Sequence, residues 1–106
     1  MIQQLKVIGV ISELLKEKPM NAKQLANELQ YFDMHYTGAE VKGMVAILTD
    51  IYNAPIYKHQ KFLSFNWSYR YRKGSQYNFF KEVIYKVHEA LFDTMELLEH
   101  EQETEV

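Results

Sequence analysis

The chain is organised around a helix that begins with two reciprocal capping signals, in the segment TGAEVKGMVAILTDIYN at positions 37–53. Thr37 is a favourable N-cap residue, and Glu40 is placed to accept a hydrogen bond from the backbone N–H of Thr37. Tyr36 and Val41 have the spacing of a hydrophobic staple. These signals predict a helix that starts at Thr37, and they therefore also predict which side chains share a face.

One face of this central helix is apolar and the opposite face is small. Apolar side chains at helical spacing predict a buried stripe of Val41, Met44, Val45, Leu48, Ile51 and Tyr52. The opposite face, which carries no large side chain, consists of Ala39, Lys42, Gly43, Ala46, Thr49 and Asn53. A partner could therefore approach the helix backbone closely on that side.

Two further helices are predicted upstream. Residues 2–17 carry apolar side chains on one broad helical face, and Pro19 ends this helix. Asn21 and Gln24 form a second capping box, which starts a helix of two to three turns. The aromatic segment 31–36 connects it to the central helix, and we expect its side chains to pack under the domain.

A strand with alternating aromatic and polar residues follows the central helix. The segment FLSFNWSYRYR at 62–72 has this period of two. A turn is predicted at 73–75, where Gly74 can take a positive φ, and 76–80 is predicted to return as a shorter strand. Because the two lengths differ, the longer strand must bend, stay partly single, or pair elsewhere, with 56–58 as the candidate.

Residues 80–101 predict a long terminal helix with an apolar seam. Its seam residues alternate by four and three, which is the spacing of a heptad pattern: Phe80, Ile84, Val87, Leu91, Thr94 and Leu98. A small domain with three helices and a hairpin has little core left to cover so long a stripe. We therefore expect a homodimer, with an interface formed by Ile84, Val87, Leu91 and Leu98. This divides the chain into a domain at 1–80 and a dimerisation helix with an acidic tail at 81–106.

Charge is distributed unevenly, although the net charge of the 106 residues is only −2. Residues 54–82 carry six Lys or Arg against Glu82, a net of +5. Residues 83–106 carry Lys86 against seven acids, a net of −6. A basic segment of this size favours an acidic partner such as nucleic acid, provided that the acidic helix points away from it.

The order of a helix, a short capped helix, a capped central helix, a basic hairpin and a long terminal helix resembles winged helix-turn-helix DNA-binding proteins. It is most similar to the small dimeric kind, in which a C-terminal helix pairs two subunits, as in replication-terminator-like and PadR-like families. The resemblance covers nearly the whole chain but is topological, and the connection at 31–36 is longer than a strict helix-turn-helix turn. It implies an α+β domain, mainly α with a small antiparallel β-hairpin. It also implies a cytoplasmic regulator or accessory factor of transcription or replication that binds duplex DNA.

The resemblance assigns two DNA-contacting surfaces. The recognition-helix surface would be Ala39, Lys42, Gly43, Ala46, Thr49 and Asn53. The wing would be Arg70, Arg72, Lys73 and Ser75, with Gly74 at its tip. Because only Lys42, Thr49 and Asn53 could reach base edges, we expect phosphate contacts and DNA shape to contribute more than direct base readout.

Two alternative functions remain open. The first is a winged-helix adaptor or inhibitor that binds another protein through the small face of the central helix and binds no nucleic acid. The second is single-strand binding by base stacking on the aromatic strand. The second is disfavoured, because alternation places the aromatic and arginine side chains of that strand on opposite faces.

Catalytic and metal chemistry find no support in the sequence. The four histidines, at 35, 59, 88 and 100, are scattered, and there is no cysteine. No P-loop, dinucleotide fingerprint or nucleophile motif is present. We therefore expect a protein that is not an enzyme and takes no metal or cofactor. No apolar run approaches the roughly 20 residues of a membrane span, so we expect no membrane partner.

Overall fold

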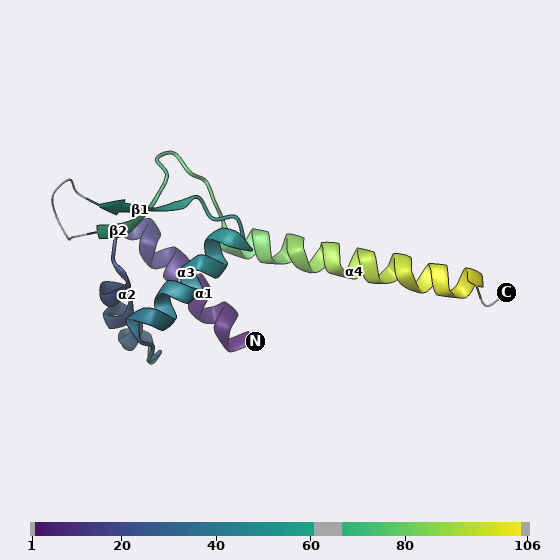
Figure 1. Cartoon of the computed structure of the whole chain (residues 1–106), viewed down its shortest axis with the longest axis horizontal. Helices are drawn as coiled ribbons and strands as arrows, with labels where there is room; N and C mark the ends of the chain where they lie inside the picture. Colours follow the sequence, from purple (N-terminus) through teal and green to yellow (C-terminus); the bar gives the residue numbers. More distant parts are fainter. Residues whose placement is uncertain (1, 61–66, 105–106) are drawn as a thin grey trace.

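The computed structural model describes residues 2–60 and 67–104. Its elements are α1 (Ile2–Glu17), α2 (Ala22–Leu29), the 3₁₀ helix η1 (Gln30–Phe32), α3 (Gly38–Asp50), β1 (Ile56–Gln60), β2 (Trp67–Tyr71) and α4 (Phe79–Thr104). The chain is mainly helical with a two-stranded antiparallel sheet, which confirms the predicted class. Figure 1 shows α1 to α3 and the hairpin gathered in one globular part, from which α4 projects.

The hydrophobic core lies among the first three helices. It includes the predicted apolar faces of α1 and α3 together with the short stripe of α2: Val7, Ile8, Ile11, Leu14, Leu15, Leu25, Leu29, Val41, Met44, Val45 and Leu48. Ile51 was predicted to extend the α3 stripe, but its side chain is 53% exposed. Ile51 is the C-cap of α3 and keeps the helical hydrogen bond to the Ile47 carbonyl, so helical spacing places it at the end of the helix and at the edge of the buried stripe.

Both predicted capping boxes are present, which confirms the starts of α2 and α3. The Asn21 side chain accepts from the backbone N–H of Gln24 at 2.8 Å, and the Gln24 side chain accepts from that of Asn21 at 2.9 Å. Thr37 Oγ1 accepts from the backbone N–H of Glu40 at 3.2 Å, and the Glu40 carboxylate accepts from that of Thr37 at 3.1 Å. Each box satisfies two backbone donors that a helix start leaves unpaired.

The aromatic connection between α2 and α3 packs only in part. Met34 and Tyr36 are half-buried against the core, but Tyr31 is 84% and Phe32 is 52% exposed. The prediction that these side chains pack under the domain is wrong for Tyr31 and Phe32. The chain continues α2 into η1 before it turns at Asp33, whose φ is 59°, so both aromatic residues stay on the outside of that extra turn.

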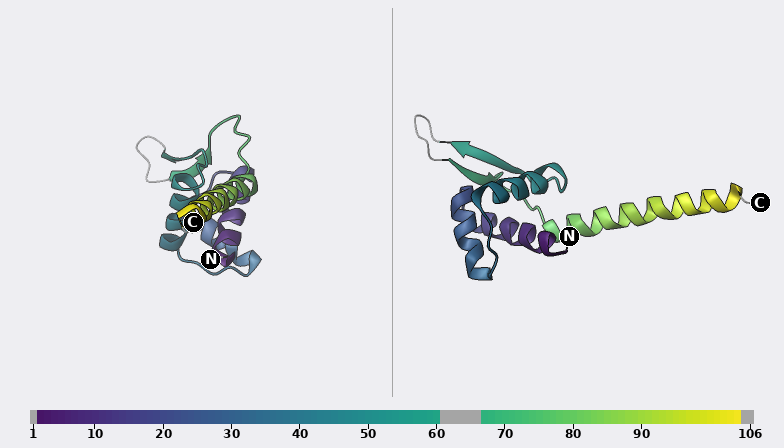
Figure 2. Two further views of the ribbon diagram at one scale, coloured as in Figure 1. Left: turned by 90° about the vertical axis from the view of Figure 1, so that its right-hand side faces the viewer. Right: turned by 60° about the horizontal axis from the view of Figure 1, so that its bottom comes forward.

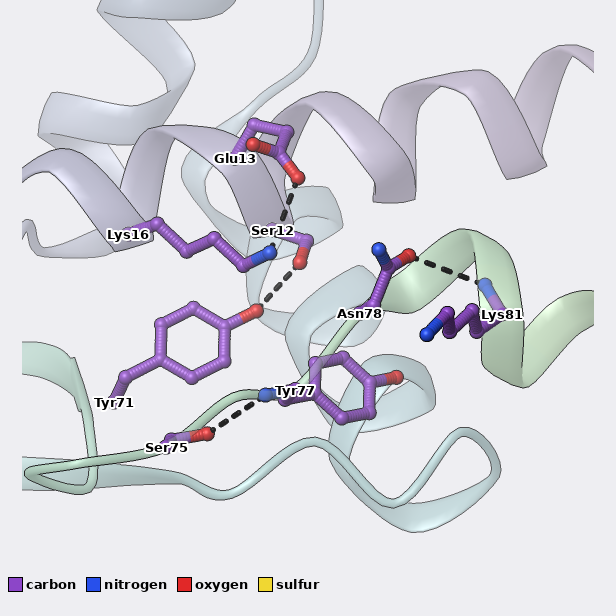
Figure 3. Close-up of polar contacts among 8 residues, drawn as sticks. All are labelled: Ser12, Glu13, Lys16, Tyr71, Ser75, Tyr77, Asn78 and Lys81. Atoms are coloured by element: carbon purple, nitrogen blue, oxygen red, sulfur yellow. Dashed lines mark hydrogen bonds and ion pairs between the residues drawn. The ribbon is translucent and has the colours of Figure 1, made fainter.

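The hairpin joins β1 and β2, with Ile56 opposite Tyr71 and Gln60 opposite Trp67. Of the predicted alternatives, pairing of the aromatic strand with the segment at 56–58 is confirmed. The prediction of a return strand at 76–80 is wrong. Residues 76–78 form neither helix nor strand, because the Asn78 side chain accepts from the backbone N–H of Lys81 at 3.2 Å and starts α4 instead (Figure 3). The predicted strand residues 62–66 lie outside the described residues.

Two contacts hold the hairpin against the helices. Tyr69 donates its backbone N–H to the Met20 carbonyl at 2.7 Å, so the α1–α2 connection pairs with β2 on the edge opposite β1. The Tyr71 hydroxyl hydrogen-bonds the buried Ser12 hydroxyl of α1 (Figure 3). Trp67, Tyr69 and Tyr71 pack against the core, as the period of two predicted.

The first turn of α4 is attached to α1 and to the end of α3. Phe79 is buried, and a Cβ added at Gly9 would lie 3.3 Å from its ring, so glycine permits this close approach. The Phe79 ring also packs edge-on against Tyr52, with centroids 5.2 Å apart. Beyond this root α4 runs outward, and Figures 1 and 2 show the hairpin and α4 toward opposite ends of a molecule 67 Å long. Within the described residues, no helix has both the length and the apolarity needed to cross a bilayer.

Candidate nucleic-acid interface

The small-residue face of α3 is open to solvent. Ala39, Lys42, Gly43 and Ala46 are exposed, and Thr49 is half-buried. A Cβ added at Gly43 would meet no atom within 4 Å. The five predicted recognition residues that belong to α3 therefore share one accessible face.

Asn53 does not belong to this face, which corrects its predicted role. It lies past the end of α3 with a φ of 57°, a left-handed conformation that asparagine tolerates better than most residues. Its side-chain amide donates to the Glu82 carboxylate of α4 at 3.3 Å. Asn53 therefore serves the α3–α4 junction.

Two lysines from different elements converge where α3 meets the hairpin. The Lys58 Nζ of β1 lies 4.3 Å from the centroid of the Trp67 ring, and the Lys42 Nζ of α3 lies 5.6 Å from it. Both distances are within the range of a cation–π interaction. The half-buried indole thus holds two ammonium groups beside the exposed face of α3.

A hollow of about 270 Å³ separates α3 from the strands beside these lysines. Its lining includes Lys42, Thr49, Asp50 and Lys58. The Thr49 hydroxyl is within hydrogen-bond distance of the Ala46 carbonyl, at 3.1 Å, and of the Asp50 carboxylate, at 3.2 Å. Because the Thr49 hydroxyl donates its proton within α3, it can act toward a ligand mainly as a hydrogen-bond acceptor. The positive charge of this hollow comes from Lys42 and Lys58.

Lys58 was missed as a candidate site residue. Its place beside Trp67 depends on the register of the sheet, in which Lys58 is opposite Tyr69 and so shares a face with Trp67. The sequence signals were its membership of the basic segment 54–82 and of the segment 56–58, which was one open pairing partner for 62–72. Neither signal gave the register, so the neighbours of Lys58 could not be assigned.

The predicted wing residues do not lie at a hairpin tip, which corrects that prediction. Arg70 is in β2 opposite Tyr57, and the backbone N–H of Arg72 donates to the Pro55 carbonyl at 2.9 Å. Lys73 follows in the turn that leads to α4, and the Ser75 hydroxyl accepts from the backbone N–H of Tyr77 (Figure 3). The described pairing runs from Gln60 opposite Trp67 to Ile56 opposite Tyr71, and the predicted wing residues lie at the Ile56–Tyr71 end, which we call the base of the hairpin. This end lies near the end of α1.

The base of the hairpin nevertheless gathers cations. Arg70 and Lys73 line a hollow of about 360 Å³ together with Lys16 and Lys18. The side chain of Arg70 leaves the sheet on the face opposite Lys58 and Trp67, because the two sets alternate along the paired strands. The structure therefore places Arg70 of the predicted wing on the hairpin face opposite Lys58 and Trp67, which lie beside the predicted recognition face of α3.

The terminal helix presents uncovered apolar side chains in the single chain. These residues, each between 52% and 63% exposed, are Phe80, Ile84, Tyr85, Val87, Leu91, Phe92 and Met95. Three of the four predicted interface residues, Ile84, Val87 and Leu91, are among them, and the side chain of Leu98 lies outside the described residues. Contiguous apolar surface of this kind marks an interaction site.

The resolved pKa shifts concern three half-buried tyrosines. Burial raises the pKa of Tyr69 and Tyr71 above the usual value, and that of Tyr77 further. These phenols therefore stay protonated near neutral pH, and Tyr77 uses its proton in a hydrogen bond to a backbone carbonyl. In the part of the chain that the structure describes, no three His, Asp or Glu side chains gather in a group able to hold a metal.

Comparisons with protein-family models, with curated proteins and with solved structures found no match to this chain.

Proposed function

We propose that this chain is a dimeric winged-helix protein that binds duplex DNA through the exposed face of α3 and the adjoining hairpin. It would act in the cytoplasm as a regulator or accessory factor of transcription or replication. The observation that carries the proposal is the convergence of Lys42 and Lys58 on Trp67, at a helix face whose other side chains are small.

The shape of α3 suits a groove of DNA. The major groove is wide enough to admit one α-helix, and small side chains let a helix backbone approach the base edges. Because Gly43 and Ala46 are exposed and Gly43 faces open space, the middle of α3 offers no steric obstacle. The two lysines at the edge of this face would neutralise phosphates and set the register, while base readout would be limited to few contacts.

The charge distribution supports the same orientation. The helix α4 carries the acidic segment, and it leaves the globular part toward the end opposite the hairpin (Figure 1). A duplex at the α3–hairpin surface of one chain would therefore lie away from most of the negative charge of that chain's own α4.

Pairing of two chains through α4 completes the proposal. Its apolar stripe has no cover in the single chain, and burying such side chains contributes about 25 cal/mol per Å² of apolar surface. A dimer would also present two α3 faces, which is how paired DNA-binding units reach two half-sites.

The test is a titration of labelled duplexes of random sequence at two salt concentrations, followed by anisotropy and by the fluorescence of Trp67, the single tryptophan. Wild type is compared with the double variant Lys42→Ala, Lys58→Ala. A matched control, Lys6→Ala with Lys23→Ala, removes the same charge from exposed positions elsewhere. The first double variant should lower affinity and reduce the logarithmic salt slope by up to about two, since each phosphate contact contributes about 0.9. The control should change both much less.

Absence of duplex binding by wild type at low salt would overturn the proposal. The adaptor function would then take its place, with the small face of α3 as a protein-binding surface. In that case a bulky residue at Gly43 should abolish partner binding, whereas Lys58→Ala should have little effect.

A further inference from the structure

A second cationic surface lies away from the α3 face, around the hollow between the end of α1 and the outer face of the hairpin. Four cationic side chains line it, Lys16, Lys18, Arg70 and Lys73, against a single carboxylate, Glu17. They come from two separate segments that the fold brings together. Such a concentration of like charge is unfavourable unless an anion is bound or water screens it.

Arg70 is half-buried, whereas the three lysines of this group are exposed. The Arg70 Nε is shielded from solvent and has no hydrogen-bond partner among the described residues. A buried donor left without an acceptor is unfavourable, and more so when it is charged. Within the described residues no carboxylate lies within ion-pair distance of Arg70, Lys18 or Lys73, while Lys16 pairs with Glu13 at 3.4 Å.

The end of α1 explains only part of the cluster. Cations near a helix C-terminus complement the negative end of its dipole, and this accounts for Lys16 and Lys18. It does not account for Arg70 and Lys73, which belong to β2 and to the turn after it. The orphaned donor of Arg70 likewise has no acceptor in the described part of α1.

We infer that this hollow binds a phosphate group, with Arg70 as its principal donor and Lys18 and Lys73 as supporting charges. A guanidinium presents planar, paired N–H donors that match a tetrahedral oxyanion, and lysines add point charges. The inference extends the proposed function, because the backbone phosphate of a bound duplex is one source of such a group. A separate phosphate ion or phosphorylated small molecule is the other source.

The first arm of the test uses duplex DNA. The variant Lys18→Ala, Arg70→Gln, Lys73→Ala is compared with a control of equal charge change, Lys6→Ala, Lys23→Ala, Lys81→Ala, after both are shown to keep the wild-type helical content. The first variant, called the hollow variant, should reduce the slope of log affinity against log salt concentration by up to about three, without altering preference between sequences. Glu17→Gln should act in the opposite direction and raise affinity several-fold, because it removes the only carboxylate of the lining.

The second arm uses inorganic phosphate, titrated at constant ionic strength against chloride while the Arg70 Nε–Hε resonance is followed by NMR. A saturable shift should appear in wild type, and half-saturation should need several-fold more phosphate in the variant Lys18→Ala, Lys73→Ala, which keeps the Arg70 resonance but loses the supporting charges. If phosphate moves the resonance but the duplex does not, the hollow takes a small phosphate compound and the DNA source is overturned.

The two arms separate this inference from the proposed function. A duplex that binds wild type and the hollow variant with the same salt slope, together with an unmoved Arg70 resonance, would overturn the inference and leave DNA binding by α3 intact. A phosphate-induced shift in a protein that binds no duplex would support the inference and overturn DNA binding by α3.

Discussion

The Tyr77 hydroxyl donates a hydrogen bond, 2.6 Å long, to the backbone carbonyl of Tyr52, and so joins the segment before α4 to the end of α3. The Tyr52 ring contacts Phe79, and the amide of Asn53 reaches Glu82. The root of the projecting helix is thus held by three contacts to one short segment, residues 52–53. This junction makes the position of α4 dependent on the end of the helix that we propose enters DNA.

Loss of the Tyr77 hydroxyl should weaken this junction. Tyr77→Phe removes one donor and leaves the carbonyl of Tyr52 without this partner, which should lower the free energy of unfolding by about 1 kcal/mol. Urea denaturation followed by circular dichroism measures the change. Tyr85→Phe is the control, because Tyr85 is exposed on α4, and it should leave stability unchanged. Equal effects of both substitutions would argue against a structural role of the Tyr77 hydroxyl.

Stability should fall at alkaline pH. Burial, followed by the nearby Tyr71 and Glu82, raises the pKa of Tyr77, and burial is also the largest cause of the raised pKa of Tyr71. Because both pKa values are higher in the folded than in the unfolded chain, the neutral phenols contribute stability below about pH 10 that is lost as the pH rises above it. Unfolding at pH 7 to 11 should show this decline, and Tyr77→Phe should make it shallower. A wild-type protein that gains stability above pH 10 would contradict the assignment.

The helix caps should each contribute measurably. Asn21→Ala, Thr37→Ala and Asn78→Ala remove the acceptors at the starts of α2, α3 and α4, at a cost of about 1 kcal/mol each. Chemical denaturation of the single variants measures these losses. Asn27→Ala lies in the exposed interior of α2, where alanine is the better helix former, and should not destabilise.

These caps also show which parts of the fold could be predicted from the sequence. Thr37 and Glu40 are three positions apart, so their interaction depends on local geometry alone, and the starts of α2 and α3 could be read directly. Strand pairing is different, because the alternating pattern of 62–72 is compatible with a partner on either side. The choice depended on Asn78 capping α4 and on the burial of Phe79, and neither is visible in the periodicity of the strand.

The candidate site was predictable to the extent that it depends on a helix face. Lys42, Gly43 and Ala46 share the exposed side of α3 because helical spacing puts them there. Lys58 and Arg70 could not be placed in the same way, since their surroundings depend on the β1–β2 register and on contacts with α1. Asn53 was misplaced because α3 ends at Asp50 and Asn53 itself adopts a left-handed conformation, so the helical face does not extend to it.

Dimer formation through α4 can be tested with one added charge. Leu91→Glu places an unpaired carboxylate in the apolar seam and should convert a dimer to a monomer that keeps its helical content, as measured by sedimentation equilibrium. His88→Glu adds the same charge at an exposed position outside the predicted seam and should leave the dimer largely intact. A wild-type protein that sediments as a monomer at tens of micromolar would refute the dimer.

The charges of α4 predict that two chains pair in antiparallel orientation. Residues 92–104 carry five acids and no Lys or Arg, whereas residues 79–91 carry two of each sign. Parallel pairing would place the two acidic halves together, while antiparallel pairing separates them. Antiparallel pairing centred on the seam sets Ile84 opposite Thr94. Since the chain has no cysteine, mixing Ile84→Cys with Thr94→Cys should give a disulfide-linked heterodimer, and Ile84→Cys alone should not cross-link. Efficient cross-linking of Ile84→Cys with itself would indicate parallel helices.

Because α4 runs outward from the globular part, its length and its angle at the root determine where its far end lies. At 1.5 Å per residue its 26 residues span about 39 Å, so a tilt of about 10° at the root would move the far end by about 7 Å. In a dimer built on this helix, the distance between the two α3 faces would depend on that angle. This distance between the α3 faces must match the spacing of half-sites, which recur about every 34 Å along a duplex. Substitutions at Tyr52 or Phe79, far from any base, should then change the tolerated spacing between half-sites rather than the bases preferred within each one.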